Sequence, residues 1–425
     1  MLSKLKTIFT EKTIRNRVFF ILGMLIVFRA LSTIPVPGVN KFALQQFLGD
    51  SSFFQVLNLF SGGGLSSLSI LMLGIGPFIT ASIVIQLMTM VFPRMKELQQ
   101  EEGQAGRQKL SQYSRMLTVP LALIQTFALV TIINKQSPDV FGSLTSFGFA
   151  QIAIIVVGAS VLLMWLSERL TEFGIGNGSS IIIAVGIIAS FPQAVSRIVS
   201  TYDATQAPTL IVIIALVVCA IAAIVYITEA ERLIEVTYAR QARSIGSQGA
   251  TGTNKSYIPI RLNQAGVMPI IFALTLLMFP SFIANIMSAS AVESIRSVGT
   301  FLSYWLQNNV VHGILYFILV FFFTYFYTAI TFDPKKISEN LQRGGAFVPG
   351  IRPGDATIDY LSRIVTRTTL VGALFLGLIA ILPSIVQSFT GIASITVGGT
   401  GILIVVSTVI DIIKKTDAQI GMREY

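Results

Sequence analysis

The side chains that could carry out acid–base, nucleophilic or metal chemistry lie mostly outside the long apolar stretches of this sequence. Glu229, His312 and Asp411 fall at the ends of such stretches, and only Arg29 lies deep inside one. His312 lacks the partner ligands that a metal site needs, and Cys219 has no second cysteine with which to form a disulfide. The sequence therefore predicts no enzyme active site, no metal and no cofactor.

The glycine-rich segment LTEFGIGNGSSIII (170–183) has a superficial similarity to a phosphate-binding loop. Such a loop follows a strand and continues with Lys-Ser or Lys-Thr, and neither feature is present here. We interpret its glycines as a tight turn. Because no nucleotide site is expected, the chain is not expected to hydrolyse ATP, and any driving force must come from a partner or a gradient.

Ten apolar stretches of about twenty residues, separated by short polar loops, dominate the chain. With 53% apolar residues, 12% charged residues and a mean hydropathy of +0.75, the chain has too little polar surface for a soluble domain. Continuous apolar runs of this length predict helices rather than barrel strands, so the fold class is an all-α polytopic membrane protein. The expected spans are 18–34, 70–92, 116–134, 147–166, 179–199, 209–228, 265–287, 310–332, 364–387 and 392–413.

Basic residues are confined to alternate loops, which sets the orientation of the spans. With Arg367 at a span edge counted in its loop, 25 of the 30 Lys and Arg residues lie on the side of the N-terminus. Four lie on the other side and one lies within a span. Both termini are therefore expected in the cytoplasm.

Ten spans divide into two sets of five, expected at 1–203 and 204–425. Because five is odd, the second set enters the membrane from the opposite side, so inverted halves around a central pathway are possible.

Ion-coupled transporters usually carry ionisable residues at membrane depth, and the spans here contain almost none. For Arg29 we favour a bond to a neighbouring carbonyl, or snorkelling, over a role in a pathway.

The segment between the first two spans contains FSGGGLSSLSILMLGIGP (60–77). Three successive glycines interrupt a helix there, and a helix of about nine residues would cover about half a bilayer. A half-helix at that depth is tolerated only where it lines a protein cavity, so it predicts a re-entrant piece and a cavity. The alternative is an amphipathic helix on the outer surface.

Several of these motifs, in this order, resemble the SecY family, the pore-forming subunit of the bacterial protein-export translocon. The resemblance runs from about residue 14 to residue 413. FVPGIRPG and GIGNG form its most specific combination. The motifs are IPVPGVN (34–40), the GGG segment, GPFITASIVIQL (76–87), LSQY (110–113), GIGNG (174–178), LNQAGVMPIIFA (262–273), GGAFVPGIRPG (344–354) and TRTTLVGALFLG (366–377).

The resemblance implies two five-helix halves around a central pore, with a constriction at mid-membrane. A ring of branched apolar side chains would surround a passing polypeptide without binding it specifically and would limit ion leak by dewetting. Isoleucines that only fill helix contacts are the alternative for any single position. The residues implied for the ring are Ile79, Ile83, Ile183, Ile187, Ile271 and Ile404.

The resemblance also implies a mobile plug at about 61–73 and a lateral gate between the second and seventh spans. Gln86, Gln125 and Asn263 are expected to form hydrogen bonds near the cytoplasmic part of that gate, each worth about 0.6 to 2 kcal/mol. The plug and its glycine hinge comprise Gly62, Gly63, Gly64, Leu65, Leu68, Leu71 and Leu73.

Two long cytoplasmic loops, 229–264 and 333–363, are expected to be docking surfaces. Arg352 lies between Ile351 and Pro353 and could pair with RNA phosphate or with a carboxylate. By resemblance, the partners are the ribosome, the SecA motor ATPase, small SecE-like and SecG-like membrane subunits, secretory preproteins with their signal sequences, and lipids. The first loop carries only Arg240 and Arg243 near its tip, fewer basic residues than is usual in the family, which weakens the case for tight binding there.

The sequence thus favours a protein-conducting channel that translocates unfolded secretory polypeptides and releases apolar segments into lipid. An inverted-repeat transporter of a small solute is the alternative, and an intramembrane enzyme a more distant one. The expected location is the bacterial plasma membrane, with the plastid thylakoid less favoured.

Overall fold

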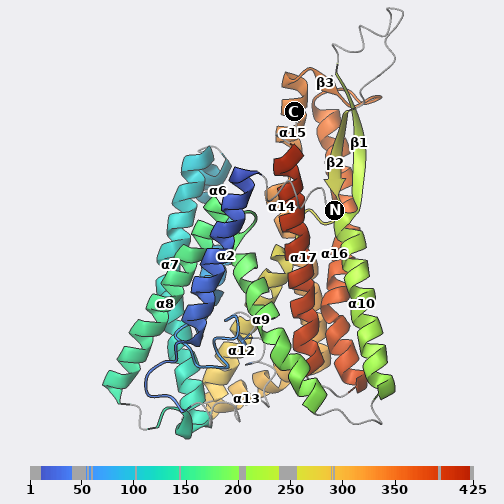
Figure 1. The fold of residues 1–425 in the computed structure, drawn as a ribbon. Coiled ribbons are helices and arrows are strands. Elements are labelled where there is room, and N and C mark those ends of the chain that lie inside the picture. The colour runs from blue at the N-terminus through green and yellow to red at the C-terminus, as the bar shows by residue number, and fades with distance from the viewer. Residues whose placement is uncertain are drawn as a thin grey trace, which may run out of the picture.

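The computed structural model describes residues 11–40, 54, 57–58, 61–100, 103–142, 145–200, 207–238, 256–288, 290, 292–390 and 394–421. Its long helices run roughly along one axis, side by side (Figure 1). Within the described residues, the helices of at least 16 residues are α2 (Lys12–Thr33), α5 (Gly76–Val91), α7 (Gly103–Gln136), α8 (Ser146–Phe173), α9 (Gly178–Ser200), α10 (Ala207–Glu229), α12 (Met268–Ser288), α14 (Asn309–Thr331), α16 (Asp355–Thr390) and α17 (Ser394–Gly421).

Each of these helices overlaps one of the expected spans. Three of them, α5, α9 and α10, contribute only shorter apolar segments, at Gly76–Val91, Gly178–Pro192 and Ile214–Glu229. The full count of ten crossings remains a prediction. Among the described residues, five helices are long and apolar enough to cross a membrane by length and composition: Gly103–Lys135, Ser146–Phe173, Met268–Ser288, Val310–Arg343 and Asp355–Val386.

Polar side chains set several of the helix starts. Thr145 caps α8 by accepting a hydrogen bond from the Gly148 amide at 3.2 Å. Asn308 caps α14 in the same way, accepting from the Val310 amide at 3.0 Å. Helix ends that are capped in this way leave fewer backbone groups without partners.

A small antiparallel sheet rises above one end of the bundle (Figure 1). Strand β1 (Glu231–Tyr238) pairs with β2 (Ser256–Arg261) on one side and with β3 (Ala346–Phe347) on the other. Helix α15 (Pro334–Arg343) lies beside β3. Both expected docking loops therefore contain ordered structure. These strands were not expected from the sequence, although Ile234 and Val236 alternate with more exposed neighbours in the period-2 pattern of a strand.

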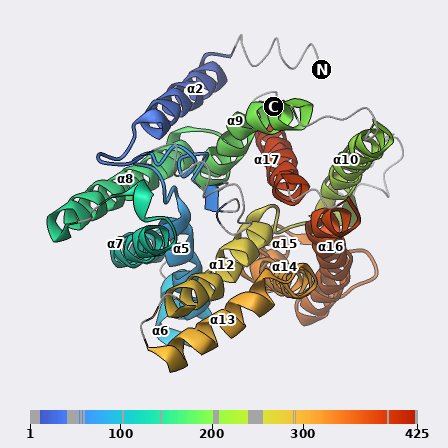
Figure 2. The ribbon, with the colours of Figure 1, turned by 90° about the horizontal axis from the view of Figure 1, so that it is seen from below.

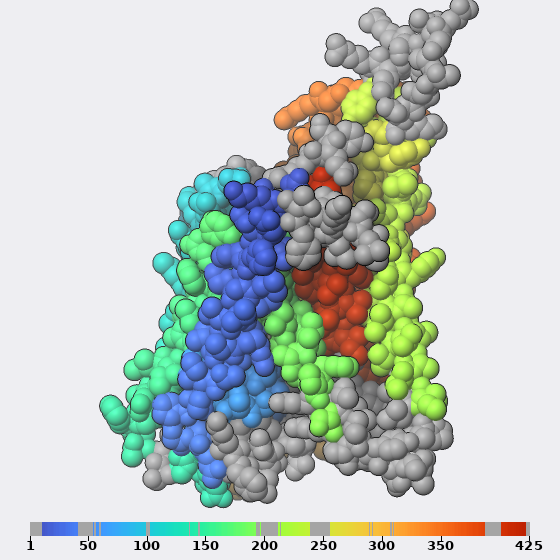
Figure 3. All heavy atoms as spheres, viewed as in Figure 1, coloured from blue at the N-terminus to red at the C-terminus, as the bar shows by residue number. Residues whose placement is uncertain are grey.

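The helices are arranged as an irregular ring when the bundle is viewed from below (Figure 2). Helix α9 packs on α17 at one place in the ring, and α5 and α7 pack on α12 at another. On the face shown in Figure 3, α2, α9, α17 and α10 follow one another from left to right. Helix α2 starts at the sheet end of the bundle and α10 ends there, so the two run in opposite directions (Figure 1).

Three short helices complete the described fold. They are α6 (Pro93–Gln100), the single-turn η1 (Pro138–Val140) and α13 (Glu293–Gln307). Helix α13, which the sequence analysis did not predict, packs against α12 and α14.

The expected plug half-helix is not a helix. Residues 61–75 form consecutive turns, interrupted by an isolated bridge between Ser69 and Pro35. Gly62, Gly63 and Gly74 have positive φ angles of 65°, 86° and 59°, and Leu68 also adopts a positive φ of 41°. These left-handed residues break any continuous helical run, because α-helices require negative φ throughout. The segment nevertheless folds into the bundle, as a compact set of turns.

Candidate central pore and its plug

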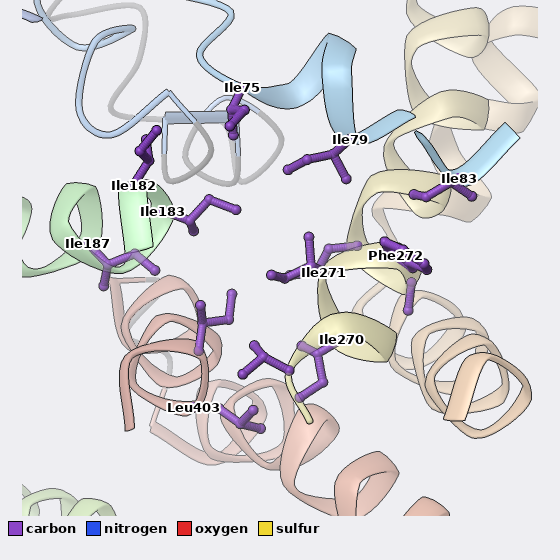
Figure 4. Packing of buried hydrophobic residues seen from close by; sticks show 14 of the residues in the cluster. Ile75, Ile79, Ile83, Ile182, Ile183, Ile187, Ile270, Ile271, Phe272 and Leu403 are labelled. Atoms are coloured by element: carbon purple, nitrogen blue, oxygen red, sulfur yellow. The ribbon is translucent and has the colours of Figure 1, made fainter. Parts of the chain in front are cut away.

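Isoleucines from four helices lie together in one buried cluster at the centre of the bundle. The six predicted ring residues all belong to it. Figure 4 shows Ile79 of α5, Ile183 of α9 and Ile271 of α12 directed toward one another across the middle. The exposed fractions are 4% for Ile79, 2% for Ile83, 1% for Ile183, 8% for Ile187, 1% for Ile271 and 1% for Ile404.

The six do not occupy equivalent places. Ile83 lies one turn farther along α5, beside Phe272 of α12, rather than at the centre (Figure 4). Ile187 packs against α17, where a Cβ on Gly401 would lie 2.9 Å from the Ile187 Cγ2 atom. Gly401 therefore creates the space that Ile187 fills.

Sequence reasoning missed further members of the cluster. The family motifs point to a few positions on each helix. The buried cluster also contains residues that lie just before a helix or on an adjacent face of it. Ile75 directly precedes α5 and lies just outside the motif GPFITASIVIQL (76–87), which supplies the ring positions in this helix. The additional residues are Ile75, Ile182, Ile270, Phe272 and Leu403.

The turns of the plug segment (61–73) are held by serine side chains and by Asn58. Ser61 Oγ accepts a hydrogen bond from the Leu65 amide at 2.9 Å, and Asn58 Oδ1 accepts from the Ser66 amide at 2.9 Å. Ser69 Oγ accepts from the Leu71 amide at 3.2 Å. Serine and asparagine favour such local bonds over helix, which explains why FSGGGLSSLS forms turns.

The plug segment pairs with the IPVPGVN motif through backbone hydrogen bonds. The Val36 amide donates to the Leu68 carbonyl at 2.8 Å, and the Ile70 amide donates to the Ile34 carbonyl at 2.9 Å. This pairing fixes the plug segment to the end of α2. It could not be inferred from the sequence, because each strand of the bridge is only a few residues long.

The glycine end of the plug segment contacts α2 and α9. Arg29 Nη1 donates a hydrogen bond to the Gly62 carbonyl oxygen at 3.3 Å, as the preferred interpretation of this arginine expected. A Cβ on Gly62 would lie 2.5 Å from the Phe28 ring, and a Cβ on Gly186 of α9 would collide with the Gly62 Cα. Only glycine fits on both sides of this contact.

The leucines of the plug segment are buried on two sides. Leu71 belongs to the isoleucine cluster. Leu65, Leu68 and Leu73 pack instead in a second cluster with residues of α7 and α8, including Leu129. Leu65, Leu68 and Leu71 are fully buried and Leu73 is 1% exposed, so the plug segment is packed into the bundle beside the isoleucine cluster.

A cavity of about 400 Å³ lies on the other side of the cluster, between α5, α7, α8, α9, α12 and α14. Ile79, Ile271 and Phe272 of the cluster line it together with Phe78, Met268 and Tyr327, and the remaining lining residues are polar. Arg115 Nε bonds Glu168 Oε1 at 2.7 Å there and joins α7 to α8. The arrangement is a polar vestibule that ends on an apolar layer.

The three residues expected as a polar gate cluster have separate environments. Asn263 is 4% exposed and its amide bonds within its own turn, accepting from the Gly266 amide at 2.9 Å and donating to the Gly266 carbonyl at 3.2 Å. Gln86 lines the cavity and donates to Ser82 Oγ at 3.1 Å, and its buried Oε1 has no partner within the part of the chain that the structure describes. Gln125 lies half-buried on α7.

The GIGNG segment forms the turn between α8 and α9. Asn177 Oδ1 accepts from the Ser179 amide at 3.1 Å, and Thr171 Oγ1 accepts from the Gly178 amide at 2.9 Å. Gly176 has a φ of 104°, a conformation that favours glycine. The expected tight turn is confirmed.

The docking candidates are only partly described. Arg240 and Arg243 lie outside the described residues. Arg352 is exposed, and its backbone carbonyl accepts a hydrogen bond from Thr357 Oγ1 at 2.9 Å. Gly350 and Gly354 on either side have φ angles of 79° and 101°, so the loop turns sharply around it.

The family model described as SecY matches residues 69–413. The chain belongs to the SecY family. The SecY-family protein translocase subunit of Aquifex aeolicus is 39% identical over 430 residues, covering 99% of this chain and 98% of the relative. The corresponding subunit of Halalkalibacterium halodurans is 40% identical over 437 residues, covering 100% of this chain and 99% of the relative.

Solved structures share the SecY-family fold. One, described as a protein conducting channel, has a TM-score of 0.66 at 19% identity and covers 94% of this chain and 91% of its own. Another, Sec61 in a canine ribosome-channel complex from the endoplasmic reticulum, has a TM-score of 0.63 at 18% identity with the same coverage. At these identities the likeness shows the fold.

Proposed function

We propose that this SecY-family chain is the protein-conducting channel of a protein translocase and that unfolded polypeptides pass between Ile79, Ile183 and Ile271. The chain is 39% and 40% identical, over nearly its full length, to two protein translocase subunits, and this similarity supports the functional class. The convergence of the three isoleucines supports the path. A layer of flexible apolar side chains adapts to many sequences and excludes water, which suits a channel for unrelated polypeptides.

The closed state depends on the plug segment. Its leucines and turns lie against the isoleucine cluster, and its glycine end is bonded to Arg29. A solved SecY-like structure is described as one in which the plug stabilises the closed channel and maintains a membrane seal. In this chain, opening requires the contacts of Gly62 with Arg29 and Gly186 to separate.

The two halves, 1–203 and 204–425, open relative to each other. Helix α9 packs on α17 on one side of the ring, and α5 and α7 pack on α12 on the other. The polar vestibule lies at the second contact, so apolar segments of a substrate would leave into lipid between α5 and α12. Gln86 is positioned at this seam, and Gln125 and Asn263 are further candidates.

The translocase works with partners on its cytoplasmic side. Two structural neighbours of this fold are ribosome-bound channels. We assign ribosome binding and SecA motor binding to the loops that carry Arg240, Arg243 and Arg352, with ATP hydrolysis performed by the motor. Small SecE-like and SecG-like subunits complete the complex.

The chain is a membrane protein with bacterial relatives. The excess of basic residues on the side of the sheet and α15 supports a cytoplasmic location of that side in a bacterial cell, together with both termini.

A photo-crosslinker at Ile183 tests the path directly. A secretory preprotein jammed midway in membranes that contain this chain should become attached at Ile183, and removal of its signal sequence should abolish attachment. A crosslinker at Phe147, which is 80% exposed on α8, is the matched control and should stay free of substrate. Jamming without attachment at Ile183, Ile79 or Ile271 would contradict the proposed path.

A further inference from the structure

The surface of helix α13 has three sides with different surroundings and side chains. Gly299 is buried and faces α12, where a Cβ on it would lie 2.5 Å from the Met287 carbonyl carbon. A second side is apolar and exposed. It presents Ile295, Val298, Phe301 and Trp305, which are 42%, 53%, 65% and 48% exposed.

The third side of α13 is polar and exposed. It carries Glu293, Arg296, Ser297 and Thr300, with the phenol ring of Tyr304, 73% exposed, among them. At 100° per residue these positions lie together on the helix, between the side facing α12 and the far edge of the apolar side. One helix therefore presents three kinds of surface: one packed on protein, one apolar and exposed, and one polar and exposed.

The place of α13 in the fold fits such a boundary. It lies at the end of the bundle away from the sheet (Figure 1), and in the view along the bundle it is seen lengthwise at the rim (Figure 2). Ile286 of α12 and Val310 of α14, next to it in the fold, are also exposed, at 37% and 66%. The apolar side of α13 therefore continues the apolar surface of the two helices that it joins.

We propose that α13 is an interfacial helix that lies in the outer headgroup region of the bilayer, with its apolar side in the lipid and its polar side in water. The aromatic rings of Phe301 and Trp305 are neighbours on the apolar side, with centroids 6.2 Å apart. Tryptophan prefers the boundary between hydrocarbon and water, and Arg296 on the polar side can reach a lipid phosphate. Because Gly299 packs tightly on the end of α12, the lipid contact also fixes the outer end of α12.

The chain has two tryptophans, Trp165 and Trp305, so fluorescence can report on α13 alone. The variant Trp165→Phe is reconstituted in phosphatidylcholine and phosphatidylglycerol vesicles whose acyl chains are brominated either near the headgroup or near the chain end. Bromines near the headgroup should quench Trp305 about twofold more than bromines near the chain end, as expected for an interfacial depth. Acrylamide should quench it weakly.

Two results would overturn the proposal. Strong acrylamide quenching without bromolipid quenching would place the apolar side in water. Protection from both quenchers would mean that protein, such as a second copy of the chain, covers it. The matched variant Trp305→Phe retains Trp165, which is 47% exposed on α8, and shows how a tryptophan outside α13 responds in the same vesicles.

A second measurement, with a spin label on α13, leaves both tryptophans unchanged. Cys219 is the only cysteine, so Cys219→Ser combined with Phe301→Cys allows a single spin label on α13. Relaxation by oxygen should exceed relaxation by a soluble nickel chelate at position 301. The reverse order there would also refute lipid contact.

Discussion

Arg29 Nη1 donates a hydrogen bond to the Gly62 carbonyl oxygen at 3.3 Å, joining a charged side chain of α2 to the first turn of the plug segment. On its other side Gly62 lies against Gly186 of α9. One residue of the plug segment is thus held between two helices by a charge-assisted bond and by close backbone packing. Both contacts must be lost before the segment can leave its place, which makes them testable determinants of the closed state.

The variant Arg29→Leu should open the channel more often. A hydrogen bond to a charged group contributes about 1.5–3 kcal/mol, and the 3.3 Å length places this one near the lower value. The population with a displaced plug should therefore rise roughly tenfold. Chloride efflux from vesicles that contain the variant measures this leak. Arg17→Leu on the same helix is the control and should leave efflux unchanged; equal leak from both would remove the role assigned to Arg29.

The variant Gly186→Ala should loosen the plug segment from the side of α9. The added methyl group would overlap Gly62, and overpacking of this kind costs about 1–3 kcal/mol. Gly158→Ala in α8 is the matched control, because a Cβ there meets nothing within 4 Å and the change should stabilise the helix by about 0.5–1 kcal/mol. Thermal unfolding in detergent and vesicle efflux together distinguish the two. If Gly186→Ala behaved as Gly158→Ala does, α9 would not constrain the plug segment.

The plug shows where sequence reasoning was sufficient and where it failed. The apolar character of 65–73 and the three glycines indicated a piece folded into the bundle, and that is what the turns are. The helical form was wrong, because the hydrogen bonds of Ser61 and Ser69 and the bridge from Ser69 to Pro35 compete with a helix. Such competition depends on a partner strand 34 residues away, which periodicity cannot reveal.

The long helices were predictable for a simple reason. Each must satisfy its backbone within an apolar stretch, so composition alone marks it. The polar gate residues were not predictable in the same way. Asn263 was expected to bond across a helix seam, yet its amide is used within its own turn. A side chain that has both a donor and an acceptor can form its hydrogen bonds locally or across an interface, and only the three-dimensional structure shows which it does.

The variant Gln86→Met should stabilise the closed seam between α5 and α12. No group among the described residues bonds the buried Gln86 Oε1, and an unsatisfied buried acceptor costs about 1–3 kcal/mol. Methionine has a similar length and removes that acceptor. Export of preproteins with weakly hydrophobic signal sequences should therefore fall several-fold, while strong signals should be little affected. Ser160→Ala in α8 removes a buried hydroxyl that has no partner among the described residues and is the control away from the seam. Loss of weak-signal export in this variant too would assign the effect to general stability.

The variant Arg352→Ala should weaken partner binding without changing stability. The side chain is exposed, so unfolding should shift by no more than about 0.5 kcal/mol. If it pairs with a carboxylate or phosphate of a cytoplasmic partner, affinity should fall about tenfold or more, which a vesicle flotation assay with the motor ATPase or with ribosomes measures. Lys335→Ala on α15 is a charge-matched comparison. Equal loss in both variants would indicate a diffuse electrostatic effect in place of a positioned arginine.

The contact of Gly401 with Ile187 predicts a non-additive pair. Alone, Gly401→Ala places a methyl group about 2.9 Å from Ile187 Cγ2, so it should displace Ile187 toward the centre and cost about 1–3 kcal/mol. Alone, Ile187→Ala leaves a cavity in the cluster and should cost about 2–5 kcal/mol.

Combined, the two changes should partly compensate, because the new methyl group then occupies space that the isoleucine has vacated. The coupling energy should lie at about 0.5–3 kcal/mol, in the direction of a double variant more stable than the sum. Thermal unfolding of all four proteins measures it, and preprotein export reports whether the restored packing also restores the path. Simple additivity would mean that Ile187 does not pack on α17 in the membrane, and its place in the ring would then have to be revised.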